Sequence, residues 1–108
     1  MTMADPMAPS QEFLVWIRNE LPVTTPADDR ARLVAAERER VAELVANGVM
    51  RRLWRVAGRR ENVGIFVAPT ATALHAALES LPMYPYLKIT VVPLADHVSD
   101  PGNGGQAR

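Results

Sequence analysis

The chain has 108 residues, a length typical of a single domain. Twelve basic and twelve acidic residues leave no net charge, which argues against a nucleic-acid partner and against a polybasic membrane anchor. Cysteine is absent, which excludes disulfides, zinc–thiolate sites and thiol nucleophiles, and no apolar stretch approaches the ~20 residues of a membrane helix. The first residues also lack the features of a secretory signal. We therefore expect a soluble, cytoplasmic, one-domain protein.

Alternating segments and chain breakers predict the fold. In chain order, residues 12–21 predict a strand, 26–47 a helix, 49–57 and 61–68 two strands, 70–81 a second helix and 87–92 a last strand. The order βαββαβ is the ferredoxin-like plan of the α+β class: a four-stranded antiparallel sheet with both helices on one face. Residues 12–98 form the expected domain, between a disordered leader (1–11) and a disordered tail (99–108).

The second face of such a sheet has no cover within the chain. Candidates for this open face include Val15, Leu53, Ile65 and Ile89, although the sequence leaves open which residues of each strand point which way. A large uncovered apolar face predicts self-association, so we expect at least a homodimer.

Glu37 stands out on the first helix. With Leu33 set at 0° and about 100° per residue, Leu44 lies at about 20°, Glu37 at about 40° and Val41 at about 80°. Glu37 thus lies inside the apolar stripe, where burial would raise its pKa toward that of a useful general base. The alternative is a structural ion pair with an arginine such as Arg52 or Arg55, or a side chain that reaches the rim.

The following strand carries three arginines around a tryptophan. Alternation places Arg52 and Trp54 on one face, and Arg51, Leu53 and Arg55 on the other. One interpretation is an arginine that clamps a ligand carboxylate beside an aromatic wall facing Glu37. The other is solvated or paired arginines with Trp54 in the core.

The two histidines give weaker signals. His75 lies on the flank of the second helix, about 100° from Leu74, where a rim position and a structural role are both open. His97 has no partner at metal-ligand spacing, and the chain lacks a glycine-rich phosphate loop and the common hydrolase and zinc motifs. The sequence therefore predicts neither a metal nor a cofactor.

Three segments, taken together, resemble the muconolactone isomerase family. They are LWRVAG (residues 53–58), AP-T (68–70) and ALHAALESLPMYPYLKITV (73–91), in the family's order. The resemblance implies ferredoxin-like subunits that pair sheet to sheet as dimeric α+β barrels, with decamers in the type members. It also implies a cofactor-free proton shift in aromatic catabolism, from muconolactone to 3-oxoadipate enol-lactone or on a related small carboxylated lactone. The partners expected are this substrate and further copies of the chain.

This chemistry needs a base, a cation near the lactone carbonyl and a cation for the substrate carboxylate. Glu37 matches the family's glutamate on the first helix. The site residues that we expect are catalytic Glu37, Arg52 and His75, and substrate-binding Trp54, Arg55 and Tyr86.

The chain departs from the family at several positions. Arg52 replaces a histidine, Arg59 and Arg60 replace a His-Tyr pair, and Val63 and Gly64 replace Tyr and Ser. Two alternatives to the isomerase therefore stay open. One is another small enzyme on the same fold, such as a cyclase, a dehalogenating enzyme or an isomerase of natural-product biosynthesis. The other is a non-catalytic module for ligand binding or oligomerisation.

Overall fold

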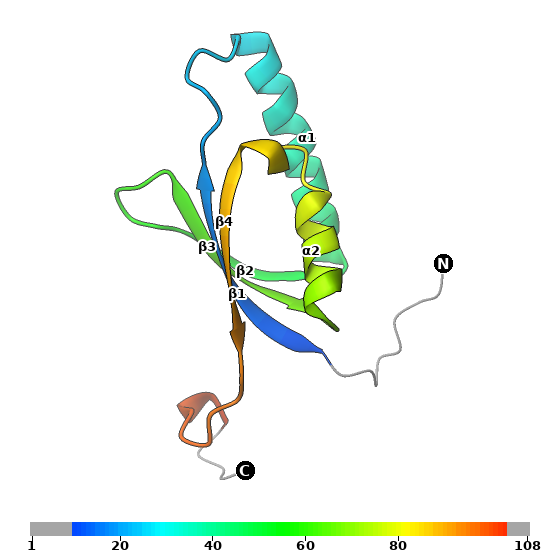
Figure 1. Ribbon diagram of the computed structural model, residues 1–108, viewed down its shortest axis with the longest axis vertical. Helices are drawn as coiled ribbons and strands as arrows, with labels where there is room; N and C mark the ends of the chain where they lie inside the picture. Colours follow the sequence, from blue (N-terminus) through cyan, green and yellow to red (C-terminus); the bar gives the residue numbers. More distant parts are fainter. Residues whose placement is uncertain (1–9, 104–108) are drawn as a thin grey trace.

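The computed structural model describes residues 10–103, which form four strands and two α-helices (Figure 1). The elements in chain order are β1 (Gln11–Asn19), α1 (Ala27–Ala46), β2 (Met50–Arg55), β3 (Glu61–Ala68), α2 (Ala71–Glu79) and β4 (Leu87–Leu94), with 3-10 turns at Tyr84–Tyr86 and Pro101–Asn103. The βαββαβ order predicted from the sequence is confirmed. The predicted bounds differ from the observed ones by no more than two residues.

The ends of the chain were expected to be disordered. Residues 1–9 and 104–108 lie outside the described residues, so the expectation stays open there. Inside the described range, β1 begins at Gln11, and Pro101–Asn103 form a short 3-10 turn. Neither α-helix of the described part has the length and apolarity needed to cross a membrane.

The sheet is antiparallel throughout, in the order β2-β3-β1-β4. Both helices lie on the same side of it, and α1 begins beyond the end of β1 (Figure 1). In the two central strands, Val15 of β1 pairs with Gly64 of β3, and Val15 also pairs with Val91 of β4. Residues paired directly across neighbouring strands point to the same face, so Val15, Gly64 and Val91 all face the helices.

The core lies between the sheet and the helices. Phe13, Val15 and Phe66 from the strands are at most 1% exposed, and they pack with Leu44 of α1 and Leu74 of α2. Burying a large apolar side chain contributes about 1.5–3 kcal/mol. The stripe of apolar residues on each helix thus supplies the main force that holds the helices on this face.

Local chemistry ends and starts the helices at the predicted places. The Thr70 side chain accepts a hydrogen bond from the Ala73 backbone N–H at 3.0 Å, so Thr70 is the N-cap of α2. Gly48, just after α1, has a φ of 76°, which glycine adopts without the steric cost of a Cβ atom. Gly58 has a φ of 77° in the turn that joins β2 to β3.

The open face of the sheet differs from the expectation. Of the four candidates only Ile65 lies on it, next to Leu14 of β1. Val15 is fully buried toward the helices, and Leu53 shares that side because both residues pair with Gly64. Ile89 pairs with Ile17 of the core and is also on the helix side. Alternation separates the two sets in each strand, but only the pairing register shows which set faces the helices.

Candidate functional site

Glu37 lies between α1 and the turn that follows α2. Its side chain is half-buried, and its Oε1 accepts a hydrogen bond from the Met83 backbone N–H at 3.0 Å. Burial raises the pKa of the Glu37 carboxyl above its ordinary value, and the Met83 hydrogen bond partly offsets this. Within the described residues no hydrogen bond to Oε2 is found, so one carboxylate oxygen is held and the other is available.

Contacts between α1 and the end of α2 fix this position. The Arg40 Nε donates to the Ser80 Oγ at 2.8 Å, one turn along α1 from Glu37. The Ser80 hydroxyl in turn donates to the Ala77 carbonyl at 2.6 Å. These bonds hold α1 against the α2–β4 connection, so Glu37 meets the Met83 backbone rather than a sheet arginine.

A polar pocket opens on the helix side of the sheet, at the end where α1 begins. Its volume is about 260 Å³, and its lining residues come from β1, the loop after it, α1, β2, the β2–β3 turn and β3: Asn19, Leu21, Arg30, Arg55, Arg60 and Asn62. In the part of the chain that the structure describes, none of the three arginines of this pocket forms an ion pair. We call it the arginine pocket.

Asn19 connects the arginine pocket to Glu37. Its side-chain Oδ1 accepts from the Leu21 backbone N–H at 2.9 Å, and its Nδ2 contacts the Met83 sulfur at 3.4 Å. Met83 is the residue whose N–H holds Glu37. A carboxylate with a raised pKa and a cationic pocket are therefore joined through two intervening residues.

Of the predicted site residues on β2, Arg55 lines the arginine pocket, whereas Arg52 and Trp54 do not face Glu37. Arg52 pairs with Ile65 and Trp54 with Val63, so both lie on the open face, where the Arg52 guanidinium stacks 4.6 Å from the Trp54 ring centroid. The expected clamp of Arg52 and Trp54 over Glu37 is thus wrong. A register shift between Met50 and Arg52 interrupts the strand's alternation after the buried Met50.

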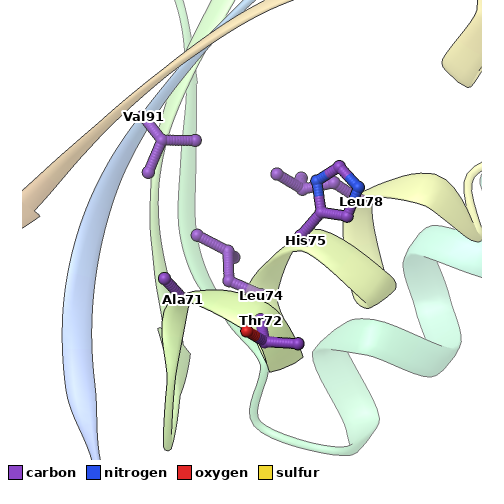
Figure 2. Close-up of a pocket in the computed structure, with 6 residues that line it drawn as sticks. All are labelled: Ala71, Thr72, Leu74, His75, Leu78 and Val91. Atoms are coloured by element: carbon purple, nitrogen blue, oxygen red, sulfur yellow. The ribbon is translucent and has the colours of Figure 1, made fainter.

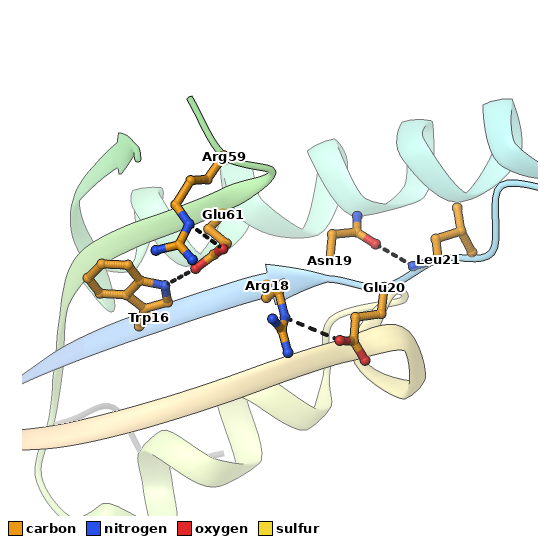
Figure 3. A network of polar contacts seen from close by, with 7 residues as sticks. All are labelled: Trp16, Arg18, Asn19, Glu20, Leu21, Arg59 and Glu61. Atoms are coloured by element: carbon orange, nitrogen blue, oxygen red, sulfur yellow. Dashed lines mark hydrogen bonds and ion pairs between the residues drawn. The ribbon is translucent and has the colours of Figure 1, made fainter. Parts of the chain in front are cut away.

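The open face carries a polar network of its own (Figure 3). The residue Glu61 is 9% exposed; its carboxylate accepts a hydrogen bond from the Trp16 Nε1–H and forms an ion pair with the Arg59 Nε at 3.0 Å. Nearby, Arg18 pairs with Glu20 at 3.2 Å. Glu61 was not predicted from the sequence as a site residue. Its place after a turn, with an arginine two residues before it, was the available signal.

His75 and Tyr86 lie away from the arginine pocket's lining. His75 is exposed, pairs with Glu79 at 3.2 Å and stands edge-on to the Tyr84 ring. It borders a shallow apolar groove of about 400 Å³ between α2 and β4, shown in Figure 2. Tyr86 is 38% exposed and belongs to the same short turn as Met83, whose carbonyl accepts its N–H at 2.8 Å.

Four polar residues of the arginine pocket were not predicted from the sequence: Asn19, Arg30, Arg60 and Asn62. Arg30 had a usable signal, since it lies seven residues before Glu37 and therefore within about 20° of it around the helix. Asn62 had one too, because it pairs with Arg55 across the β2–β3 hairpin. Arg60 lies in a turn, where no periodicity predicts the direction of a side chain.

Comparison with known proteins gives one consistent result. The family model described as muconolactone delta-isomerase matches residues 11–100. The chain is 37% identical over 87 residues to the muconolactone delta-isomerase of Acinetobacter baylyi, covering 81% of this chain and 91% of that one. It is 38% identical, with the same coverage, to the enzyme of that name from Pseudomonas aeruginosa.

The fold agrees as well. A crystal structure of muconolactone isomerase superposes with a TM-score of 0.78 at 37% identity, over 82% of this chain and 93% of that one. The half-buried carboxylate of Glu37 and the arginine pocket thus occur in a chain whose sequence and fold both match one family of isomerases. The chain belongs to the muconolactone delta-isomerase family.

Proposed function

We propose that this chain is a cofactor-free isomerase that moves a proton within a small unsaturated lactone bearing a carboxylate, with muconolactone as the first substrate to test. The observation that carries the proposal is Glu37: a half-buried carboxylate whose pKa is raised by burial, in a chain of this family. A carboxylate in water is a weak base at neutral pH. Raising its pKa makes it a stronger base and improves the match to the operating pH.

The reaction balances without an added reactant. The Glu37 Oε2 takes a proton from the saturated carbon at the far end of the C=C–C=O system, the electron pair of that C–H bond becomes a new C=C bond, the original C=C bond shifts toward the carbonyl carbon, and negative charge develops on the lactone carbonyl oxygen. The same proton then returns to the carbon next to the carbonyl, and the C=O bond re-forms. The Met83 N–H on Oε1 fixes the plane of the carboxylate so that Oε2 keeps one direction throughout.

The positive charge of the neighbouring arginine pocket favours binding of an anionic substrate. Arg55, which the sequence predicted to bind substrate, lines that pocket on the helix side of the sheet. The other predicted site residues are candidates of lower rank, because within residues 10–103 no contact connects their side chains to Glu37 or to the arginine pocket: Arg52, His75, Trp54 and Tyr86.

The open face supports the proposal that the working form is at least a homodimer. Val63, Ile65 and Leu14 lie on it with Trp54 and Val92, of which the last two are more than 40% exposed. Pairing of two such faces would remove these side chains from water. Assembly beyond the dimer, up to a decamer, and a cytoplasmic location stay predictions from the sequence.

The direct test uses the purified full-length protein and muconolactone in D2O, followed by proton NMR. We expect conversion to the enol-lactone with deuterium at the newly protonated carbon, to the extent that the proton on Glu37 exchanges with solvent. A folded protein that binds the lactone but never isomerises it would contradict the proposal and favour a ligand-binding module. Isomerisation of a different lactone, with muconolactone untouched, would contradict the substrate.

A further inference from the structure

We propose that Arg30, Arg55 and Arg60 form the subsite that binds the free carboxylate of the substrate, with Asn19 and Asn62 as neutral hydrogen-bond donors at its wall. This inference rests on the proposed isomerase function, because it assigns a part of the same site. It concerns a binding role, so it can also be tested without turnover.

Ion pairs are distributed unevenly among the arginines of the chain. In residues 10–103, five arginines pair with carboxylates: Arg18, Arg32, Arg40, Arg51 and Arg59. Arg52 instead stacks on Trp54. Among these described residues the three arginines of the pocket have no carboxylate partner, and neither has Arg38, which lies outside the pocket, although the chain holds as many acidic as basic residues. Like charges gathered in one concave pocket repel each other, and a bound anion relieves that repulsion.

The guanidinium group of arginine is also well suited to bind a carboxylate. A guanidinium offers paired N–H groups in a plane, which match the two oxygens of a carboxylate. Arg30 already donates one N–H to the Pro22 carbonyl at 2.9 Å, which ties its side chain to the loop before α1. A partly fixed arginine loses less side-chain freedom when the ligand binds.

The β2–β3 hairpin directs two neighbouring arginines to opposite faces of the sheet. Arg59 points to the open face, where it pairs with Glu61 (Figure 3). Arg60, the next residue, lines the arginine pocket on the helix side, beside Arg55 and Asn62. One arginine is thus used to neutralise a buried carboxylate, while the next is left without an internal anion.

The distance from Arg30 to the proposed base also suits a small ligand. Arg30 and Glu37 lie on one side of α1, about 20° apart around the helix and about 10 Å apart along its axis. A six-carbon acid spans about two residues of extended chain, or about 7 Å. The long side chain of Arg30 can cover the remaining distance of about 3 Å, so a ligand whose carboxylate is held by the arginine pocket can extend its ring along α1 toward Glu37.

The experiment compares Arg60→Gln with Arg32→Gln as a matched control. Both substitutions remove one positive charge, but Arg32 lies on the exposed part of α1 and pairs only with Asp29. Loss of a hydrogen-bonded charge contact should raise KM for the lactone by about ten- to a hundredfold. We expect kcat to change little, because the same contact is made in the ground state and the transition state. The control should keep the KM of the parent protein.

Binding is measured separately with a saturated lactone acid, which has no C=C bond to move, and with its methyl ester, which has no carboxylate. Calorimetry on the parent protein should show binding of the acid, weakened by salt, and no binding of the ester. Arg60→Gln should bind the acid about ten- to a hundredfold more weakly, and Arg32→Gln should bind it as the parent does. Equal binding of acid and ester, or unchanged acid binding and KM in Arg60→Gln, would overturn the subsite. Specific acid binding by a protein without isomerase activity would instead overturn the proposed function and leave the subsite standing.

Discussion

The substitution Glu37→Gln separates the charge of this residue from its shape. Glutamine keeps an oxygen that can accept the Met83 N–H, so the hydrogen bond seen at 3.0 Å is retained. It cannot take a proton at neutral pH. Loss of a general base typically lowers the rate by about 10²–10⁴, which corresponds to about 3–5 kcal/mol of transition-state stabilisation. We expect kcat for the lactone to fall by that factor while the KM stays close to that of the parent.

The same substitution has a predictable effect on stability. Burial raises the pKa of the Glu37 carboxyl, so the folded state holds the proton more tightly than the unfolded chain does. The stability that this provides is fully present below the unfolded pKa and is lost as pH rises through the folded pKa. At neutral pH the ionised Glu37 therefore destabilises the fold, and glutamine removes that cost. Because water still reaches the half-buried side chain, we expect a gain below about 1 kcal/mol, or a few degrees in Tm.

Two measurements test this argument together. Thermal unfolding should show Glu37→Gln more stable than the parent at neutral pH, with the difference closing as pH falls toward the ordinary glutamate value of 4.5. The kcat/KM of the parent should rise with pH through an inflection above 4.5 that is absent in the variant. A Glu37→Ala control should be less stable than Glu37→Gln, since it leaves the Met83 N–H without this acceptor. A glutamine variant with near-parental kcat would refute the assignment of the base.

Three further outcomes follow from other parts of the fold. Gly64→Ala should lower Tm by several degrees in a melting experiment, because a Cβ atom there would lie 2.5 Å from the Arg52 carbonyl oxygen; an unchanged Tm would show that the strands can separate at low cost. Ile65→Asp on the open face should shift the protein to monomer in light scattering with its circular dichroism preserved, and a persisting oligomer would place the interface elsewhere. Arg52→Lys should leave KM for the lactone unchanged in steady-state kinetics, whereas an increase would return Arg52 to the substrate site.

The elements were predictable because each follows from local pattern. The apolar stripe around Leu44 gives α1 a period that only a helix provides, and Thr70 starts α2 by capping it. The partly buried position of Glu37 could also be predicted from the sequence, since a carboxylate in an apolar stripe must face a neighbouring element. What this neighbour is depends on how α1 meets the end of α2. That contact, through Met83, joins residues 46 positions apart, and no local pattern encodes it.

The faces of the sheet could not be predicted from alternation alone. Arg52 and Trp54 were correctly grouped together and separated from Leu53 and Arg55, but their side of the sheet was assigned wrongly. One register shift between Met50 and Arg52 decides this, because a single extra residue exchanges the two faces for the rest of the strand. The arginine pocket escaped notice for the same reason: its members come from separate elements and meet only in the folded chain.

The Glu61 network explains how a charged residue can lie on a face that is expected to be covered. A carboxylate enclosed between two sheets would be costly if either oxygen lacked a partner. In this chain the Glu61 Oε1 accepts from Trp16 and its Oε2 pairs with Arg59, so both oxygens are satisfied within one subunit. A second sheet can then pack over Ile65 and its neighbours without leaving a lone charge. The open face can therefore be buried without any change in the Glu61 network. We expect Arg59→Ala to weaken the association of subunits more than it weakens the fold of one subunit.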